Sequence, residues 1–141
     1  MLPGEIHHHR HFYLDRDTGE FRGKYLLTLA ALPGGDLVVR VLTSRPHGRP
    51  MEPPCYHGDP YPGFYLGILG GQLQRASWLD LRASDDVDAN DVNKEESRGD
   101  LSLVMALNNN LFRQALNCAA SASDTTRLQE RAIRDLMATL P

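Results

Sequence analysis

The fold is decided by residues 24–43, which read KYLLTLAALPGGDLVVRVLT. Residues 24–32 form an apolar, β-prone run between Gly23 and Pro33, and its length is typical of a buried strand. Residues 33–36, PGGD, have the composition of a hairpin turn. Residues 37–43, LVVRVLT, are the clearest strand of the chain. The stretch therefore predicts two strands joined by a tight turn.

Shorter strand patterns lie on both sides of this hairpin. Residues 5–13 predict an edge strand, and residues 63–69 and 77–81 predict two more strands. Residues 101–106 fit a last strand or the start of a helix equally well, because periodicity does not separate the two. We expect a five- to seven-stranded antiparallel, barrel-like sheet from residues 5–82. Its predicted core residues are Leu27, Leu29, Val39, Val41, Tyr65 and Ile68.

The end of the chain has helical patterns. Residues 109–120 predict one helix, and residues 126–139 predict a second with a stronger signal. Thr126 and Gln129 have the spacing of a capping box. An apolar stripe at helical period is expected to pack this helix on the sheet through Leu128, Ile133 and Leu136. The fold class predicted is α+β in one domain, 1–141, with the barrel at about 4–106 and the helices at about 109–139.

Composition places the chain among ordinary globular proteins. Of its 141 residues, 41% are hydrophobic and 23% are charged, which excludes a disordered chain. No apolar stretch approaches the ~20 residues of a membrane helix, and the first residues do not resemble a signal peptide. One disulfide between Cys55 and Cys118 is possible, but two cysteines favour free thiols in a reducing compartment. We therefore expect a soluble, cytoplasmic protein with no membrane contact.

Charge is distributed unevenly along the chain. The net charge is −3, and residues 80–100 hold eight acidic and three basic residues, a local charge of −5. A protein that grips nucleic acid over its whole surface is usually basic. Any contact with a polynucleotide must therefore be local to the N-terminal half, while the acidic stretch is a solvated face or a docking surface for a basic partner.

Five short segments resemble, in their order and spacing, segments of the MazF/PemK toxin family. That family has a Gly-Asp-Ile start, a Gly-x-Arg-Pro that opens its second strand, a strand ending in Ile-Thr-Ser, and a Gly-x-Leu-Ser before a helix. The similar segments here are Pro3-Gly4-Glu5-Ile6, Gly23-Lys24-Tyr25-Leu26-Leu27, Val41-Leu42-Thr43-Ser44, Ser77-Trp78-Leu79-Asp80-Leu81 and Arg98-Gly99-Asp100-Leu101-Ser102.

The resemblance implies a small SH3-like barrel, usually a homodimer, that cleaves single-stranded RNA without a metal or other cofactor. It also implies a cognate antitoxin protein as partner. By position, the family's catalytic Arg corresponds to Lys24 and its Thr to Thr43, with Ser44 beside it. Lys lacks the bidentate fork of Arg. Arg22 is expected on the same side of the strand, where it could supply the guanidinium.

A proline-rich loop supplies the predicted substrate contacts. Six of the nine prolines lie between residues 46 and 62, so this stretch is expected to be irregular. Cationic and aromatic residues suit single-stranded RNA, although a rigid structural loop explains the composition equally well. Catalysis by Cys55 is disfavoured because its nearest histidine is only two residues away. The candidate RNA-binding residues are Arg45, His47, Arg49, Tyr56 and His57.

Two alternatives stay open on the sequence. His7, His9 and His11 alternate along a predicted strand, so they share one face and could bind a metal. The simpler interpretations are a solvated edge strand, or histidines that serve RNA contact and proton transfer. The chain could also be a non-catalytic barrel of the same superfamily, like the CcdB-like proteins, that binds and inhibits a protein partner.

Overall fold

The predicted hairpin is the centre of the sheet. The computed structural model describes all of residues 1–141. Strand β2 (Phe21–Ala31) and strand β3 (Leu37–Thr43) pair antiparallel, with Tyr25 opposite Leu42. The Leu32 N–H donates to the Asp36 carbonyl at 2.8 Å and closes the turn, where Gly35 has a φ of 97°. Glycine adopts this left-handed conformation without a steric penalty, and the predicted turn is confirmed.

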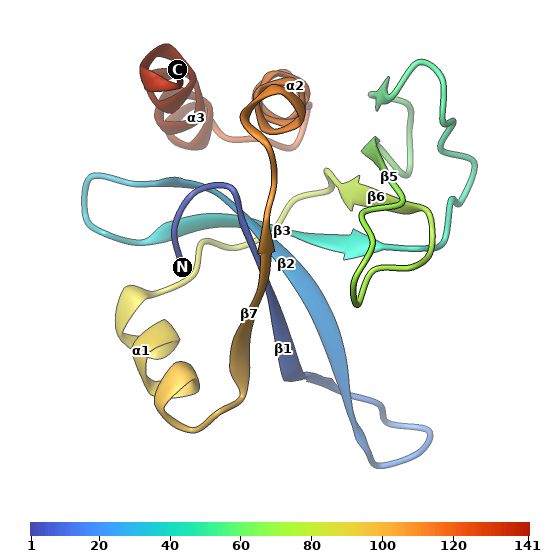
Figure 1. Cartoon of the computed structure of the whole chain (residues 1–141), viewed down its shortest axis with the longest axis vertical. Coiled ribbons are helices and arrows are strands. Elements are labelled where there is room, and N and C mark those ends of the chain that lie inside the picture. Colours follow the sequence, from blue (N-terminus) through green and yellow to red (C-terminus); the bar gives the residue numbers. More distant parts are fainter.

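Seven strands form one antiparallel sheet in the order β4-β5-β6-β3-β2-β1-β7 (Figure 1). The terminal strands β4 and β7 do not pair, so the sheet is open and is not a closed barrel. The first strand pairs with both β2 and β7, which makes the predicted edge strand an interior one. The remaining strands are β1 (Glu5–Leu14), β4 (Cys55–Tyr56), β5 (Gly63–Gly67), β6 (Ser77–Asp80) and β7 (Leu101–Ala106).

Helices lie on both faces of the sheet. Helices α2 (Asn109–Ala120) and α3 (Arg127–Thr139) cover one face, where Leu27, Val38 and Ile133 belong to the main core. Helix α1 (Ala89–Ser97) lies on the other face, where Val92 packs in a smaller core with Leu26. Successive strand residues point to opposite faces, so Leu26 and Leu27 enter different cores. The fold is therefore α+β, with two helices on one side and one on the other.

The predicted core is largely buried. Leu27, Leu29 and Val39 are buried, while Val41 and Tyr65 are half-buried. Ile68 was predicted wrongly: it is 66% exposed because β5 ends at Gly67, whose φ of 83° turns the chain away.

The last helix begins as predicted. The capping box of Thr126 and Gln129 is present, Ile133 is fully buried, and Leu136 packs against the main core. Leu128 was expected to pack on the sheet, but it is 53% exposed. It lines a shallow groove beside Pro33 instead of the core.

Helix α1 was not predicted from the sequence. It begins at the N-cap Asp88, whose carboxylate accepts the Asn90 N–H at 2.7 Å. Val92 is its one buried residue, so the apolar periodicity that reveals a helix is absent. Residues 101–106, which the sequence left open, form strand β7.

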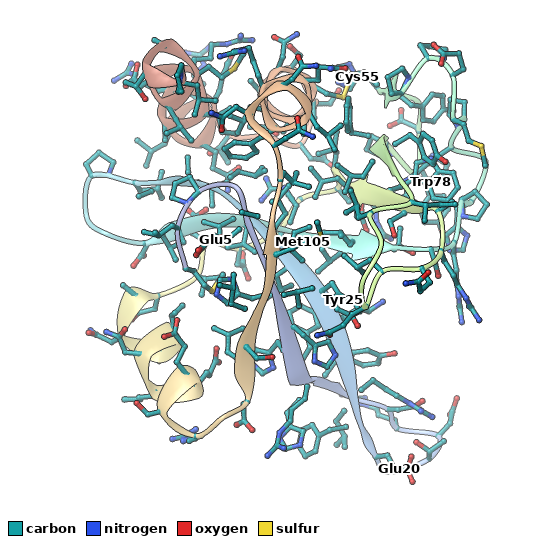
Figure 2. The ribbon with its side chains drawn as sticks, in the orientation of Figure 1. Glu5, Glu20, Tyr25, Cys55, Trp78 and Met105 are labelled. Carbon is teal, nitrogen blue, oxygen red and sulfur yellow. A yellow bond between two sulfur atoms is a disulfide. The ribbon has the colours of Figure 1, made fainter.

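The two cysteines form a disulfide that joins β4 to α2, so the prediction of free thiols is wrong. Their separation of 63 residues hides this proximity, which the packing of α2 against β4 creates. Figure 2 shows the Cys55 sulfur beside α2.

None of the helices is both long and apolar enough to cross a membrane.

Candidate functional site

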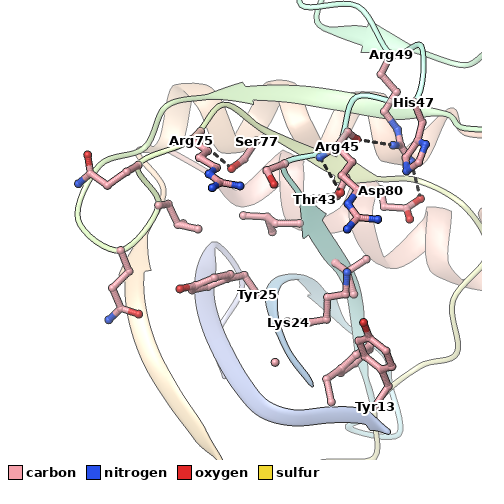
Figure 3. Close-up of a pocket in the computed structure, with 18 of the residues that line it drawn as sticks. Tyr13, Lys24, Tyr25, Thr43, Arg45, His47, Arg49, Arg75, Ser77 and Asp80 are labelled. Atoms are coloured by element: carbon pink, nitrogen blue, oxygen red, sulfur yellow. Dashed lines mark hydrogen bonds and ion pairs between the residues drawn. The ribbon is translucent and has the colours of Figure 1, made fainter. Parts of the chain in front are cut away.

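A cleft of about 650 Å³ opens where the ends of β2, β3 and β6 meet the start of the proline-rich loop (Figure 3). Both halves of the sheet contribute walls, because β3 lies between β2 and β6 in the strand order. The lining residues are Phe12, Tyr13, Gly23, Lys24, Tyr25, Val41, Leu42, Thr43, Ser44, Arg45, His47, Arg49, Gln72, Leu73, Gln74, Arg75, Ser77, Asp80 and Arg82.

The cleft is basic although the protein is acidic. Five Lys or Arg residues and one histidine line it, against a single carboxylate. The whole chain, in contrast, has a net charge of −3. Concave walls of one sign of charge raise the local concentration of an oppositely charged ligand. This cleft is therefore suited to an anion.

Lys24, in the first half of β2, and Thr43, the last residue of β3, lie on adjacent strands in this cleft. The register pairs Tyr25 with Leu42, so Lys24 and Thr43 are opposite each other at the next position of the same two strands. The Thr43 hydroxyl accepts the Arg45 N–H at 3.1 Å, and the Lys24 amine lies 5.9 Å from the centre of the Tyr13 ring. Ser44 and Arg45 line the same opening. Four candidates from two segments, β2 and the end of β3, thus share one cavity.

Arg22 lies outside the cleft. Its guanidinium donates to the Asp15 carboxylate at 3.2 Å, at the exposed end of the β1–β2 hairpin. The β1–β2 register shifts between His9 and Tyr13, so a bulge separates Arg22 from the level of Lys24. In the structure, Lys24 supplies the β2 cation of the cleft.

Arg49 belongs to the wall of the cleft and is buried, with only 3% of its surface exposed. Its guanidinium donates to the Pro62 carbonyl at 3.2 Å and forms an ion pair with Asp80 at 3.2 Å. Its side chain crosses Gly63 so closely that a Cβ there would lie 2.6 Å from the Arg49 Cδ. Arg49, predicted to contact substrate, instead ties the proline-rich loop to β5 and β6.

Asp80 is the acidic partner of two arginines. Besides pairing with Arg49, it accepts hydrogen bonds from three donors of Arg82: the backbone N–H at 3.0 Å, Nε at 3.0 Å and Nη2 at 2.6 Å. Burial alone would raise the pKa of Asp80, but the hydrogen bonds and charges of Arg82 and Arg49 outweigh it. The pKa of Asp80 therefore lies below its ordinary value, and the carboxylate stays ionised.

Tyr61 organises the cationic side of the proline-rich loop. The guanidinium carbons of Arg49 and Arg82 lie 5.4 Å and 5.0 Å from its ring centre. The His47 ring stacks on the Tyr61 ring, with the two centroids 4.6 Å apart and an interplanar angle of 19°. His47 has a φ of 48°, a conformation uncommon outside glycine. The stacked pair holds the imidazole of His47 at the cleft.

The loop is also held by Trp78. Its indole N–H donates to the Pro50 carbonyl at 3.0 Å, and the side chain is buried. The position of Arg45 and His47 is thus set by a loop that is irregular yet tied down at several points.

Tyr56 and His57 do not line the cleft. They follow Cys55 near α2, and the His57 Nε2 lies 3.0 Å from the Cys118 carbonyl oxygen. These two candidates are therefore separated from the other predicted RNA contacts.

The histidines of β1 do not converge on one point. His9 lies 3.3 Å from the Glu95 carboxylate, and His11 lies 3.5 Å from that of Asp100. His7 is buried beneath α1, and its Nδ1 has no hydrogen-bond partner. Burial, followed by the charge of the N-terminal amine, lowers the pKa of His7.

Sequence reasoning missed part of the cleft. Arg75 and Arg82 flank strand β6, and Tyr13 reaches the cleft from β1. The local signal for Arg82 was the Asp80-x-Arg82 spacing at a strand end, which permits a bidentate pair. Nothing local marks Arg75 or Tyr13, because only the sheet order brings them to Thr43.

Comparison of the chain with family models, with curated proteins and with solved structures gives no match.

Proposed function

We propose that this protein binds single-stranded RNA in the basic cleft and cleaves it without a metal ion. The observation that carries the proposal is the shared lining of the cleft by Lys24, Thr43, Arg45 and His47. Single-stranded RNA is bound by cationic grooves that also offer aromatic rings for base stacking. Phe12, Tyr13 and Tyr25 supply such rings in this cleft.

The proposed reaction is attack of a ribose 2′-hydroxyl on the adjacent phosphorus. The bond from phosphorus to the 5′-oxygen breaks, which leaves a 2′,3′-cyclic phosphate and a free 5′-hydroxyl. Lys24 and Arg45 stabilise the charge on the phosphorane oxygens. His47 takes the proton of the attacking hydroxyl, and the Thr43 hydroxyl hydrogen-bonds the reacting phosphate. Each of these side chains lines the cleft.

The proposal includes membership of the MazF/PemK-like toxins, with an SH3-like sheet, a homodimer and a cognate antitoxin. It is supported by the order of the five similar segments, each of which overlaps one of the strands β1, β2, β3, β6 and β7. Lys24 in place of Arg is the main departure. Arg45, two residues after Thr43, supplies a guanidinium that lines the cleft, whereas Arg22 lies outside it and pairs with Asp15.

The test is incubation of the purified protein with a mixed-sequence single-stranded RNA in EDTA. The wild type should release fragments with cyclic phosphate ends. Thr43→Val and Lys24→Met should each reduce the rate by about 10²- to 10³-fold, the typical cost of losing one preorganised donor. Lys24→Arg should preserve or raise the rate.

Arg22→Gln is the matched control, because it also removes a β2 cation but lies outside the cleft. It should cleave at the wild-type rate. Absence of cleavage by a folded wild type, or cleavage that Thr43→Val leaves unchanged, refutes the enzymatic proposal. RNA that is bound but not cleaved would make the protein a non-catalytic binding module.

A further inference from the structure

A second cluster of reactive side chains lies away from the cleft, around the disulfide. Cys55, His57 and Cys118 are the only group of three or more metal-ligating residues whose ligand atoms lie together, within 4.8 Å of one another. None of the three lines the basic cleft. Cys55 belongs to β4 and His57 follows that strand, both within the proline-rich loop, whereas Cys118 belongs to α2.

The distances around His57 are those of a metal site. Its Nε2 lies 3.4 Å from the Cys55 sulfur and 3.6 Å from the Cys118 sulfur. Zinc binds thiolate sulfur at about 2.3 Å and histidine nitrogen at about 2.0–2.1 Å in a tetrahedron, so a nitrogen and a sulfur ligand lie about 3.5 Å apart. The two distances from the His57 nitrogen to the sulfurs therefore already match those between ligands of a zinc site.

Only the distance between the two sulfurs differs from that in a zinc site. A tetrahedral zinc ion holds two thiolates about 3.8 Å apart, whereas here the sulfurs are bonded to each other. Reduction breaks that bond and lets them separate. The bonded sulfurs offer no thiolate, so the oxidised cluster cannot bind the ion.

We propose that reduction of the disulfide between Cys55 and Cys118 creates a zinc site with His57 as third ligand. A dithiol reductant supplies two electrons and two protons and is itself oxidised to a disulfide. The two new thiols lose their protons to solvent when zinc binds. His57 exchanges its contact with the Cys118 carbonyl, 3.0 Å away, for the metal.

The fourth position of this site is open to water. Three protein ligands plus water are typical of catalytic zinc, whereas four protein ligands are typical of structural zinc. His57 is exposed, so the ion has an entry path, while Cys118 is buried and holds the site against α2. Disulfide and zinc thus alternate as links between the proline-rich loop and α2.

The test is cobalt and zinc binding by the full chain under anaerobic conditions, after reduction with a phosphine. The reduced wild type should take up one Co²⁺ with the intense visible bands of tetrahedral coordination and a thiolate charge-transfer band, and Zn²⁺ should displace it. The oxidised protein should show neither band. Binding to the oxidised protein, or octahedral cobalt in the reduced protein, overturns the proposal.

His57→Ala isolates the third ligand, because it leaves both cysteines in place. Partners that only orient a ligand change metal affinity by about 10- to 100-fold, so loss of His57 should weaken zinc binding at least about tenfold. His11→Ala, an exposed histidine of β1, is the control and should bind zinc like the wild type. Equal affinity of His57→Ala and wild type overturns the assignment of His57.

Unfolding on reduction would not obscure the result. If circular dichroism shows that the reduced apoprotein loses structure, zinc should restore it in the wild type but not in a Cys55→Ser and Cys118→Ser double variant. Failure of zinc to restore the wild type refutes the site. The readouts involve no RNA, so they are independent of the proposed cleavage.

Discussion

Asp80→Asn tests the buried ion pair that shapes the wall of the cleft. The substitution keeps the side-chain volume and removes the charge that compensates Arg49. The Asp80 side chain is 7% exposed and that of Arg49 is 1% exposed, with 3.2 Å between them. Breaking such a pair from one side costs about 3–5 kcal/mol, because an uncompensated charge stays buried.

The expected loss lies at the lower end of that range. The Arg82 side chain is 51% exposed, and an exposed ion pair contributes only about 0–1 kcal/mol. Asparagine also retains an oxygen that accepts a hydrogen bond from Arg82. We therefore expect the free energy of unfolding to fall by about 3 kcal/mol, and Tm to fall by about 10 °C for a chain of this size.

The assay is urea denaturation followed by tryptophan fluorescence, with Asp17→Asn as the control. Asp17 is exposed, and its side chain makes no hydrogen bond or ion pair, so its substitution should change stability by less than about 0.5 kcal/mol. The double variant Arg49→Met with Asp80→Asn should recover part of the loss, because a pair replaced by apolar or neutral groups leaves no buried charge.

The same pair predicts a pH dependence. Because the folded-state pKa of Asp80 is lowered, its contribution is present above the unfolded pKa of about 3.9 and is lost as the pH falls through the folded value. The stability difference between wild type and Asp80→Asn should narrow in acid. A loss below about 0.5 kcal/mol at pH 7, or a double variant no more stable than Asp80→Asn, would refute the reasoning.

Three further predictions follow from buried polar groups and close packing. Burial lowers the pKa of His7, so the free energy of unfolding should be at its full value above about pH 6.5 and fall as the pH drops below that value. In His7→Leu, the free energy of unfolding measured in urea should change less between pH 7 and pH 5 than in the wild type. Gln129→Ala should cost about 2–4 kcal/mol in the same assay, since the Gln129 side-chain oxygen accepts the Thr126 N–H of the capping box at 3.0 Å and a hydrogen bond from the buried Arg40 guanidinium at 3.1 Å. A stability within 1 kcal/mol of wild type would contradict that. Gly63→Ala should cost about 1–3 kcal/mol by displacing Arg49, whereas Gly34→Ala, with open space around it, should be nearly neutral.

Much of the candidate site was predictable from the sequence because it lies on well-patterned strands. Lys24 and Thr43 lie on the two clearest strands, and the register of that hairpin follows from a short turn. Ser44, Arg45 and His47 come directly after β3 and reach the same cleft. The resemblance to the toxin family singled out Lys24, Thr43 and Ser44, and the cationic composition of the proline-rich loop singled out Arg45 and His47.

The other candidates depended on geometry that sequence does not carry. Arg22 and Lys24 would share a face in a regular strand, but the bulge in β1 and the ion pair of Arg22 with Asp15 separate their side chains. An arginine in a polar loop is usually exposed, yet Arg49 is buried because its side chain packs into the space left by the missing side chain of Gly63. His57 belongs to the same loop as His47 but follows Cys55 to α2.

What the sequence by itself determined about this protein is the set of local elements. The central hairpin, helix 109–120 and the Thr126 cap follow from periodicity, turn residues and capping, which are properties of neighbouring residues. Helix α1 escaped this logic because one buried residue makes no pattern.

Tertiary structure alone decided the open strand order, the disulfide and the cleft. Strand β7 pairs with β1 across 90 or more residues, and Cys55 meets Cys118 across 63. The gain from such pairings depends on which faces can be buried together, after the entropy of closing a long loop has been lost. Because that balance belongs to the whole chain, no single segment reveals it.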